Sequence, residues 1–217
     1  MELNKYIEHT LLKQDARESE IINLLDEAKR YNFLGVCVNP SFVKLSTEYL
    51  KNTDIKVVTV IGFPLGQTTS EAKVLETIDA VKNGADEIDM VLNCGKLKDG
   101  EYDYILKEIS GIKTACQGKV LKVILETDLL NQEEIKKACE LCIKAEADFV
   151  KTSTGFVKNG VGAKAEDVKL MYETVHSAGL GVKASGGIRD REAALKMIEV
   201  GAERLGTSSG VKICAGE

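Results

Sequence analysis

Short apolar runs rich in β-branched residues alternate along the chain with stretches whose apolar residues recur every three or four positions. The runs typical of strands cover residues 6–12, 34–39, 56–63, 86–93, 119–127, 147–153, 181–186 and 203–209. The spacing of a helix with one buried face is clearest in residues 19–31, 70–83 and 165–178. The pattern therefore predicts that strands and helices alternate from one end of the chain to the other.

This alternation predicts a parallel α/β sheet whose strands are joined by right-handed crossovers. Eight strands leave about 27 residues for each strand–helix unit, close to the minimum for such a step. Eight is also the number that closes a (β/α)8 barrel, also called a TIM barrel. The alternative is an open doubly wound sheet, but no Gly-x-Gly-x-x-Gly fingerprint follows the first strand.

Repeated units and an undivided chain favour one barrel. The segments NGADEIDMV, KAEADFVKT and VGAERLGTS each lead from a helix end into a strand, as repeated strand–helix units would. No linker or low-complexity stretch divides the chain, which has only two prolines. We therefore expect residues 1–217 to form a single (β/α)8 barrel catalytic domain.

Composition narrows the classes of partner. The net charge of −5 comes from 29 basic and 34 acidic residues that are spread along the chain, unlike the basic face of a nucleic-acid binder. No apolar run approaches the ~18 residues of a transmembrane helix. The N-terminal segment MELNKYIEHT lacks the apolar centre of a signal peptide, so we expect a cytoplasmic protein.

The six cysteines are expected to be reduced in such a compartment. Cys139 and Cys142 have the spacing of a redox pair, but they lie in an amphipathic helical pattern, which favours two small apolar residues of a helix. His9 and His176 are the only histidines, which disfavours a histidine-built zinc site. Metal-dependent chemistry is thus disfavoured and we expect no metal, although magnesium held by carboxylates stays open.

Four charged residues stand inside strands where the pattern should be apolar: Asp89, Lys122, Lys151 and Lys183. Helices cover the outer face of a barrel, so a charge pointing outward without a partner would cost several kcal/mol. Inside the barrel the charges can pair and reach water near the carboxyl ends of the strands, where such barrels carry their chemistry. A solvated lysine at a strand end and an inert ion-pair network are the alternatives. The functional interpretation is a lysine with a lowered pKa that attacks a carbonyl to form an imine.

Two loops rich in small residues follow the seventh and eighth predicted strands, in residues 183–189 (KASGGIR) and 205–210 (LGTSSG). Small residues let backbone N–H groups approach an anion, and these two loops form the usual phosphate site of the barrel. Glycines also serve tight turns, which is the alternative here. Residues 152–155 (TSTG) could add donors or form a capped turn.

The four charged residues and the loops 152–155 and 183–189 belong to a set of seven segments. In this order along nearly the whole chain, the segments resemble the deoxyribose-phosphate aldolase family of class I, Schiff-base aldolases. The segments are residues 8–13, 36–40, 60–66, 84–91, 121–127, 148–155 and 182–189. The resemblance implies a lyase of deoxyribonucleotide and carbohydrate catabolism without a cofactor. Its substrate would be a phosphorylated sugar, 2-deoxy-D-ribose 5-phosphate, cleaved reversibly to D-glyceraldehyde 3-phosphate and acetaldehyde. Barrels of this type often form homodimers or higher homo-oligomers, and neither nucleic acid nor membrane is an expected partner.

The resemblance also implies roles for particular residues. Lys151 matches the Schiff-base lysine, and Lys183 matches the second lysine that keeps the first amine neutral. Asp89 matches the aspartate that moves protons through water, and Lys122 a lysine that orients or charge-balances it. The family's phosphate-binding loops correspond to Gly155, Gly186, Gly187, Ser208 and Ser209.

The chain departs from the family pattern at three places. Glu8 stands where aspartate is usual, which leaves its role open. Glu146 stands where a helix-ending glycine is usual, and a left-handed conformation there costs a non-glycine residue about 1 kcal/mol. Residues 211–217 carry no tyrosine, the residue that some members use for proton abstraction. That step is then expected to rest on Asp89, Lys183 and water, or to run more slowly.

Two other functions compete with this interpretation. Another Schiff-base barrel enzyme, such as a transaldolase or a keto-acid aldolase, would share the amine chemistry and differ in substrate. A non-catalytic barrel that senses a phosphorylated sugar is disfavoured because both paired lysines are present. The sequence leaves the reactivity of Cys37 open.

Overall fold

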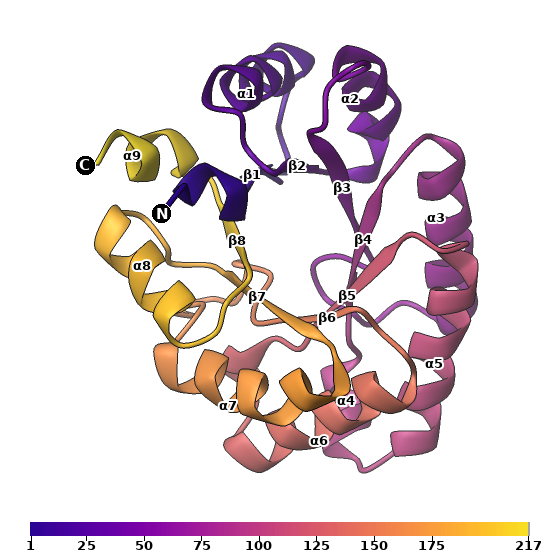
Figure 1. The fold of residues 1–217 in the computed structure, drawn as a ribbon. Helices are drawn as coiled ribbons and strands as arrows, with labels where there is room; N and C mark the ends of the chain where they lie inside the picture. The colour runs from indigo at the N-terminus through magenta and orange to yellow at the C-terminus, as the bar shows by residue number, and fades with distance from the viewer. Residues whose placement is uncertain (217) are drawn as a thin grey trace.

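Eight parallel strands close into one barrel in the order of the chain, with helices around them (Figure 1). The structure, a computed structural model, describes residues 1–216. The strands are β1 (Ile7–Leu11), β2 (Gly35–Val38), β3 (Lys56–Ile61), β4 (Glu87–Val91), β5 (Val120–Ile124), β6 (Phe149–Lys151), β7 (Gly181–Ser185) and β8 (Arg204–Thr207). The predicted (β/α)8 barrel is confirmed, and the alternative of an open doubly wound sheet is wrong because β1 pairs with β8.

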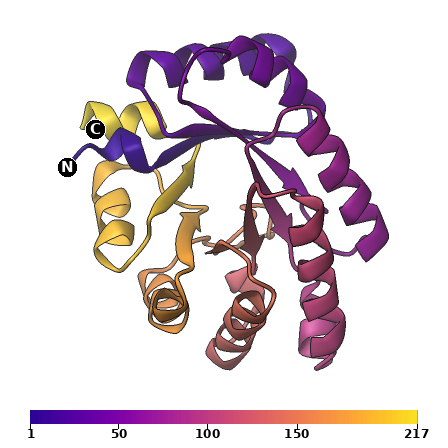
Figure 2. The same cartoon turned by 45° about the vertical axis from the view of Figure 1, so that its right-hand side comes forward.

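The helices form the outer layer of the molecule (Figures 1 and 2). They are α1 (Glu18–Tyr31), α2 (Val43–Tyr49), α3 (Ser70–Lys82), α4 (Cys94–Lys98), α5 (Tyr102–Ala115), α6 (Gln132–Lys144), α7 (Ala165–Val175), α8 (Arg191–Glu199) and α9 (Gly210–Ala215). Short 3-10 turns add η1 (Leu3–Tyr6), η2 (Pro40–Phe42), η3 (Thr127–Leu129) and η4 (His176–Ala178). The predicted helix 165–178 is thus α7 followed by η4.

Local sequence signals set where several helices begin. The side chain of Thr69 accepts a hydrogen bond from Ala72 N–H at the start of α3, and Asp190 does the same for Ala193 at α8. Asn131 and Glu134 form a reciprocal capping box at the start of α6. Such caps satisfy backbone N–H groups that a helix leaves unpaired in its first turn.

The end of α6 carries the substitution singled out in the sequence. Glu146 has a left-handed backbone with φ of 56°, the conformation that favours glycine. Its neighbour Ala147 donates its N–H to the carbonyl of Cys142 and so ends the helix. Cys139 and Cys142 are buried free thiols of α6, as the helical pattern predicted.

The apolar core lies in two places. Between strands and helices, outward-facing strand residues pack against the buried faces of the helices in one continuous cluster. Inside the barrel, Cys37, Val58 and Val60 of β2 and β3 form a smaller cluster with Leu12. The interior is therefore apolar beside β2 and β3, which leaves the remaining strands to carry the charged residues described below.

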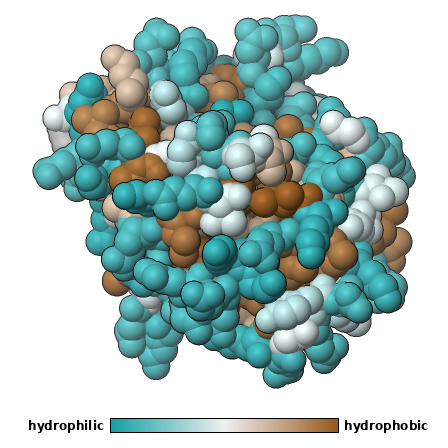
Figure 3. Space-filling view, turned by 60° about the horizontal axis from the view of Figure 1, so that its bottom comes forward, coloured by the Kyte–Doolittle hydropathy of each residue, from teal (hydrophilic) through white to brown (hydrophobic). Residues whose placement is uncertain are grey.

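The face of the molecule drawn in Figure 3 is largely polar. Figure 3 shows hydrophilic side chains over most of one face, with apolar groups between them. Within residues 1–216, no helix combines the length and apolar composition that crossing a membrane requires. The two ends of the described chain lie near each other, since η1 and α9 are in contact (Figure 1).

Candidate active site

Four charged side chains that the sequence placed inside strands are buried within the barrel. Asp89 of β4, Lys122 of β5, Lys151 of β6 and Lys183 of β7 are each 3% exposed or less. Parallel pairing sets Asp89 beside Lys122 and Lys151 beside Lys183. The inward direction that the sequence predicted is confirmed, and a surface position for these lysines is wrong.

Asp89 is the centre of the cluster. Its Oδ1 accepts a hydrogen bond from Lys122 Nζ at 2.9 Å. Its Oδ2 accepts from Lys151 Nζ at 2.8 Å and from Lys183 Nζ at 2.6 Å. Because Lys151 Nζ and Lys183 Nζ both donate to Asp89 Oδ2, the two nitrogens lie close together. The expected effect of Lys183 on the pKa of Lys151 requires this proximity.

Glu8 of β1 joins this cluster as a second carboxylate. It is fully buried and pairs with Lys183 Nζ, while its other oxygen lies 3.4 Å from Lys122 Nζ and 3.8 Å from Arg204 Nε. The sequence identified Glu8 only as a departure from aspartate. The signal that could have assigned it to the cluster was the same one used for the other strands, a charge within an apolar run.

The charges of the cluster balance without Lys151. Glu87, two residues before Asp89, lies 2.6 Å from Lys122 Nζ, so three carboxylates gather here. Lys122, Lys183 and the partly exposed Arg204 supply three positive charges. A further buried cation would lack a countercharge, and uncompensated buried charge is costly. The arrangement therefore favours a neutral amine at Lys151.

The pKa values follow the same logic. Burial is the largest influence on the pKa of Lys151 and lowers it; Asp89 raises it and Lys183 lowers it further, so the pKa lies below the ordinary lysine value. Burial also acts to lower the pKa of Lys183 and of Lys122, but Asp89 and Glu8 outweigh it and both values are raised. Lys151 is thus the lysine of the three that gives up its proton first.

The carboxylates are held ionised. Burial alone would raise the pKa of Asp89, but Lys122, Lys151 and Lys183 reverse this and hold the pKa well below its usual value. The pKa of Glu8 is lowered by Lys122 and Lys183 against the same opposing effect of burial. Both carboxylates therefore remain negative and keep Lys122 and Lys183 protonated.

A cavity of about 310 Å³ opens next to Lys151 at the carboxyl ends of the strands. Segments that follow β1, β6, β7 and β8 line it, and four of the five residues expected to bind phosphate are among them: Gly155, Gly186, Gly187 and Ser208. Ser209 stands next to this lining, and its N–H donates to Thr207 Oγ1. The amine and the small-residue loops thus face one cavity.

Two cations at the rim of this cavity were not assigned to it from the sequence. Lys13, after β1, and Arg189, after β7, both line it and both are exposed. Each stands at the end of a segment used for the family resemblance, 8–13 and 182–189. Their charge can attract an anionic group toward the loops.

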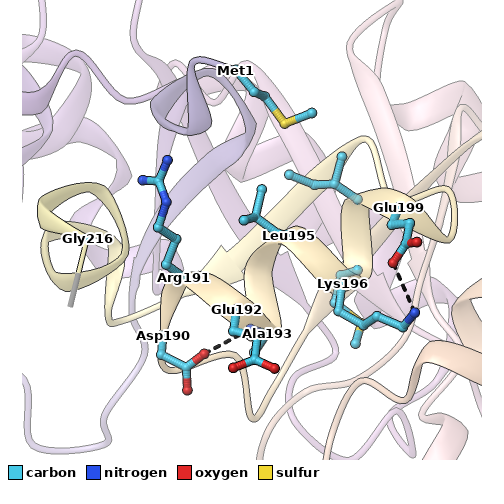
Figure 4. A pocket seen from close by; sticks show the side chains of 11 residues that line it. Met1, Asp190, Arg191, Glu192, Ala193, Leu195, Lys196, Glu199 and Gly216 are labelled. Atoms are coloured by element: carbon cyan, nitrogen blue, oxygen red, sulfur yellow. Dashed lines mark hydrogen bonds and ion pairs between the residues drawn. The ribbon is translucent and has the colours of Figure 1, made fainter.

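A larger hollow lies outside the barrel, along α8. It has a volume of about 1270 Å³ and contains none of the residues expected at the site. Met1 and Leu195 both line it, and Figure 4 shows an ion pair between Lys196 and Glu199 of the same lining. In the part of the chain that the structure describes, no group of three or more His, Cys, Asp or Glu side chains could hold a metal ion.

Comparison with known proteins gives the same family over nearly the full length. The model of the DeoC/LacD family of aldolases matches residues 4–216. A deoxyribose-phosphate aldolase of Finegoldia magna is 56% identical over 216 residues and covers all of both chains. The solved structure of the aldolase QR15 superposes with a TM-score of 0.93 at 45% identity, covering 98% of this chain and 94% of that one. The tetrameric deoxyribose phosphate aldolase of Aeropyrum pernix has a TM-score of 0.91 at 34% identity and covers 98% and 89%.

Proposed function

The chain belongs to the DeoC/LacD family of aldolases, and we propose that it cleaves 2-deoxy-D-ribose 5-phosphate reversibly to D-glyceraldehyde 3-phosphate and acetaldehyde. The observation that carries the proposal is the position of Lys151, a buried amine that shares an Asp89 oxygen with Lys183 and faces the cavity. The relatives named above support the substrate. Another Schiff-base lyase acting on a different phosphorylated sugar is not favoured by these likenesses.

The reaction begins at Lys151. Its neutral nitrogen adds to carbon 1 of the open-chain aldehyde, and the resulting carbinolamine loses water to give an iminium ion. The nitrogen loses one of its two protons in this step, and Asp89 Oδ2, which accepts a hydrogen bond from it, can relay that proton to the carbinolamine oxygen. Lys183, bound to the same oxygen, can supply a proton to the hydroxyl that leaves as water. The three groups thus exchange protons without an added cofactor.

The iminium ion then draws electrons from the bond that breaks. Acetaldehyde contains carbons 1 and 2, so this is the bond between carbons 2 and 3. The hydroxyl on carbon 3 loses its proton through water toward Asp89, and glyceraldehyde 3-phosphate leaves. The remaining enamine takes a proton at carbon 2, and water hydrolyses the iminium ion to release acetaldehyde and free Lys151.

The loops at the cavity bind the phosphate and orient the substrate. We assign this role to the backbone and hydroxyl groups around Gly155, Gly186, Gly187, Ser208 and Ser209, with Lys13 and Arg189 adding positive charge. Fixing the phosphate holds carbon 1 near the amine, so that binding energy is converted into orientation.

Trapping with acetaldehyde and borohydride tests the chemistry. Reduction of the imine should leave a stable ethyl group on Lys151, located by peptide mass spectrometry. Lys151→Ala should lose this label and about four orders of magnitude or more of cleavage activity, because the nucleophile is gone. Lys136→Ala, which changes an exposed lysine of α6 outside the cavity, should keep both. A label on another lysine, or none on the unaltered protein, would refute the assignment.

A substrate panel tests the specificity. We expect cleavage of 2-deoxy-D-ribose 5-phosphate to exceed that of a ketose phosphate or a phosphorylated 2-keto acid by at least about 10²-fold. Preference for a ketose phosphate would favour a transaldolase, and preference for the keto acid a keto-acid aldolase.

We further propose that residues 1–217 act as one catalytic domain in the cytoplasm and assemble as a homodimer or higher homo-oligomer. The Aeropyrum pernix relative is a tetramer, which supports assembly without fixing the number of copies here. Light scattering coupled to size-exclusion chromatography would measure it, and a mass of one chain across the concentration range would contradict the proposal.

A further inference from the structure

The segment after β6, residues 154–164, lies directly on the phosphate loop after β7. Ala163 donates its N–H to the carbonyl of Gly186 at 3.0 Å. A Cβ added to Gly162 would overlap the backbone of Gly186, and one added to Gly187 would overlap the carbonyl oxygen of Val161. The two segments therefore meet backbone to backbone, and a shift of one displaces the other.

Asp128, in η3 after β5, holds this segment in place. Its Oδ2 accepts a hydrogen bond from Gly162 N–H at 2.8 Å, and its Oδ1 lies 3.6 Å from Lys164 Nζ. A Cβ added to Gly160 would lie 2.7 Å from Asp128 Oδ2, so the carboxylate fits closely between two glycines of the segment. The side chain of Asp128 is only 9% exposed, although it is charged.

The beginning of the same segment is fixed from the same connection. Glu126, two residues before Asp128, accepts hydrogen bonds from the N–H and the hydroxyl of Thr154. Its backbone is left-handed with φ of 60°, a conformation that costs a non-glycine residue energy. Two carboxylates of one short connection thus bind both ends of the segment.

We propose that Asp128 is a positioning residue for phosphate binding. By holding Gly162 against Gly186 and Gly187, it keeps the backbone N–H groups of that loop at the spacing that a phosphate requires. Its own charge is engaged by Gly162 N–H and Lys164, which reduces its repulsion of the anion. The inference deepens the proposed function and rests on it for the location of the phosphate.

Asp128→Ala separates the positioning role from a purely electrostatic one, because the two predict opposite changes in phosphate affinity. Removal of a negative charge near an anion site should tighten phosphate binding. Loss of the hydrogen bond between Gly162 N–H and Asp128 should instead weaken phosphate binding. We expect the Kd for inorganic phosphate, measured by titration calorimetry, to rise about tenfold. Asp128→Asn retains an oxygen that can accept from Gly162 and should recover most of the affinity. Glu133→Ala, which removes an exposed carboxylate at the start of α6, is the charge-matched control and should leave the Kd unchanged.

Kinetics separate positioning from a general structural effect. In Asp128→Ala, KM for 2-deoxy-D-ribose 5-phosphate should rise about tenfold with kcat within about twofold, while kcat/KM for unphosphorylated 2-deoxy-D-ribose stays unchanged. Equal losses with both sugars, or phosphate affinity that is unchanged or tighter, would overturn the inference. If the unaltered protein failed to cleave the phosphorylated sugar, the proposed function would fail, and the phosphate titration would still decide the role of Asp128.

Discussion

Asp89 is a carboxylate that three lysines bind through its two oxygens. A carboxylate held so far below its usual pKa is a weak base and does not retain a proton for long. In the proposed reaction we therefore expect Asp89 to pass protons between Lys151, Lys183 and water while its own negative charge persists. We expect the same charge to stabilise the proposed iminium ion on Lys151.

Lys183 lowers the pKa of Lys151 and also competes with it for Asp89. In Lys183→Leu both effects vanish, so the pKa of Lys151 should rise and the amine should stay protonated near neutral pH. We expect kcat/KM at pH 7 to fall by at least about 10²-fold, with partial recovery in alkaline solution as Lys151 loses its proton. A pH profile of the variant checks this. Lys136→Leu, at an exposed position of α6, is the control. If the acidic side of the pH profile does not move to higher pH in Lys183→Leu, the assignment is contradicted.

Glu8 is the second countercharge of Lys183. In Glu8→Gln the cluster keeps its cations and loses a buried negative charge, which should lower the free energy of unfolding by about 3–5 kcal/mol. Glu8→Asp keeps the charge on a side chain one methylene shorter and should lose less than half as much. Urea unfolding of the three proteins measures both changes. If Glu8→Gln had the same free energy of unfolding as the unaltered chain, the contact between Glu8 and Lys183 would contribute nothing to stability.

At the scale of elements, a second buried pair joins two helices to a strand. Lys73 of α3 lies 2.9 Å from Glu108 of α5, and its Nζ also donates to the carbonyl of Val91 at the end of β4. Both side chains of the pair are fully buried. This pair lies outside the barrel and fixes α3 and α5 over the strand that carries Asp89.

Lys73→Met should destabilise the protein by about 3–5 kcal/mol, because Glu108 is left buried without its partner. The double variant Lys73→Met with Glu108→Leu should regain most of this loss, since well-packed apolar residues can replace a buried pair. A double-mutant cycle by urea unfolding gives the coupling. Additive effects of the two changes would show that the pair does not act as a unit.

The strands and helices could be predicted well from the sequence because apolar residues are spaced differently in the two. In addition, the strand faces covered by the outer helices must be apolar. The same reasoning predicted the inward direction of Lys122, Lys151 and Lys183, since a covered outer face excludes unpaired charge. It did not assign Asp128 and Glu126 to the site. Both residues follow the end of β5, where the apolar strand pattern no longer applies. A glutamate also gives no sign in the sequence that its backbone is left-handed. The pairing of Lys73 with Glu108 depends on how two helices meet, which periodicity does not give.

At the scale of the whole molecule, the cluster draws on strands from both ends of the chain. Glu8 of β1 pairs with Lys183 of β7, while Asp89 and Lys122 come from the middle. We expect selective labelling of Lys151 by acetaldehyde and borohydride at pH 7 to fall together with the circular dichroism signal as urea is raised, since both need the closed barrel. Exposed Lys158, located in the same peptide maps, is the internal reference. Preferred labelling of Lys151 after the signal is lost would contradict this dependence.

The pairing of β1 with β8 has a consequence for the chain during its synthesis. Until the last strand has emerged from the ribosome the ring cannot close, and we expect Lys151 to remain a solvated ammonium group. Free aldehydes in the cell should then meet no unusually reactive amine on the nascent polypeptide. On this expectation the topology of the barrel delays the reactivity of Lys151 until the chain is complete.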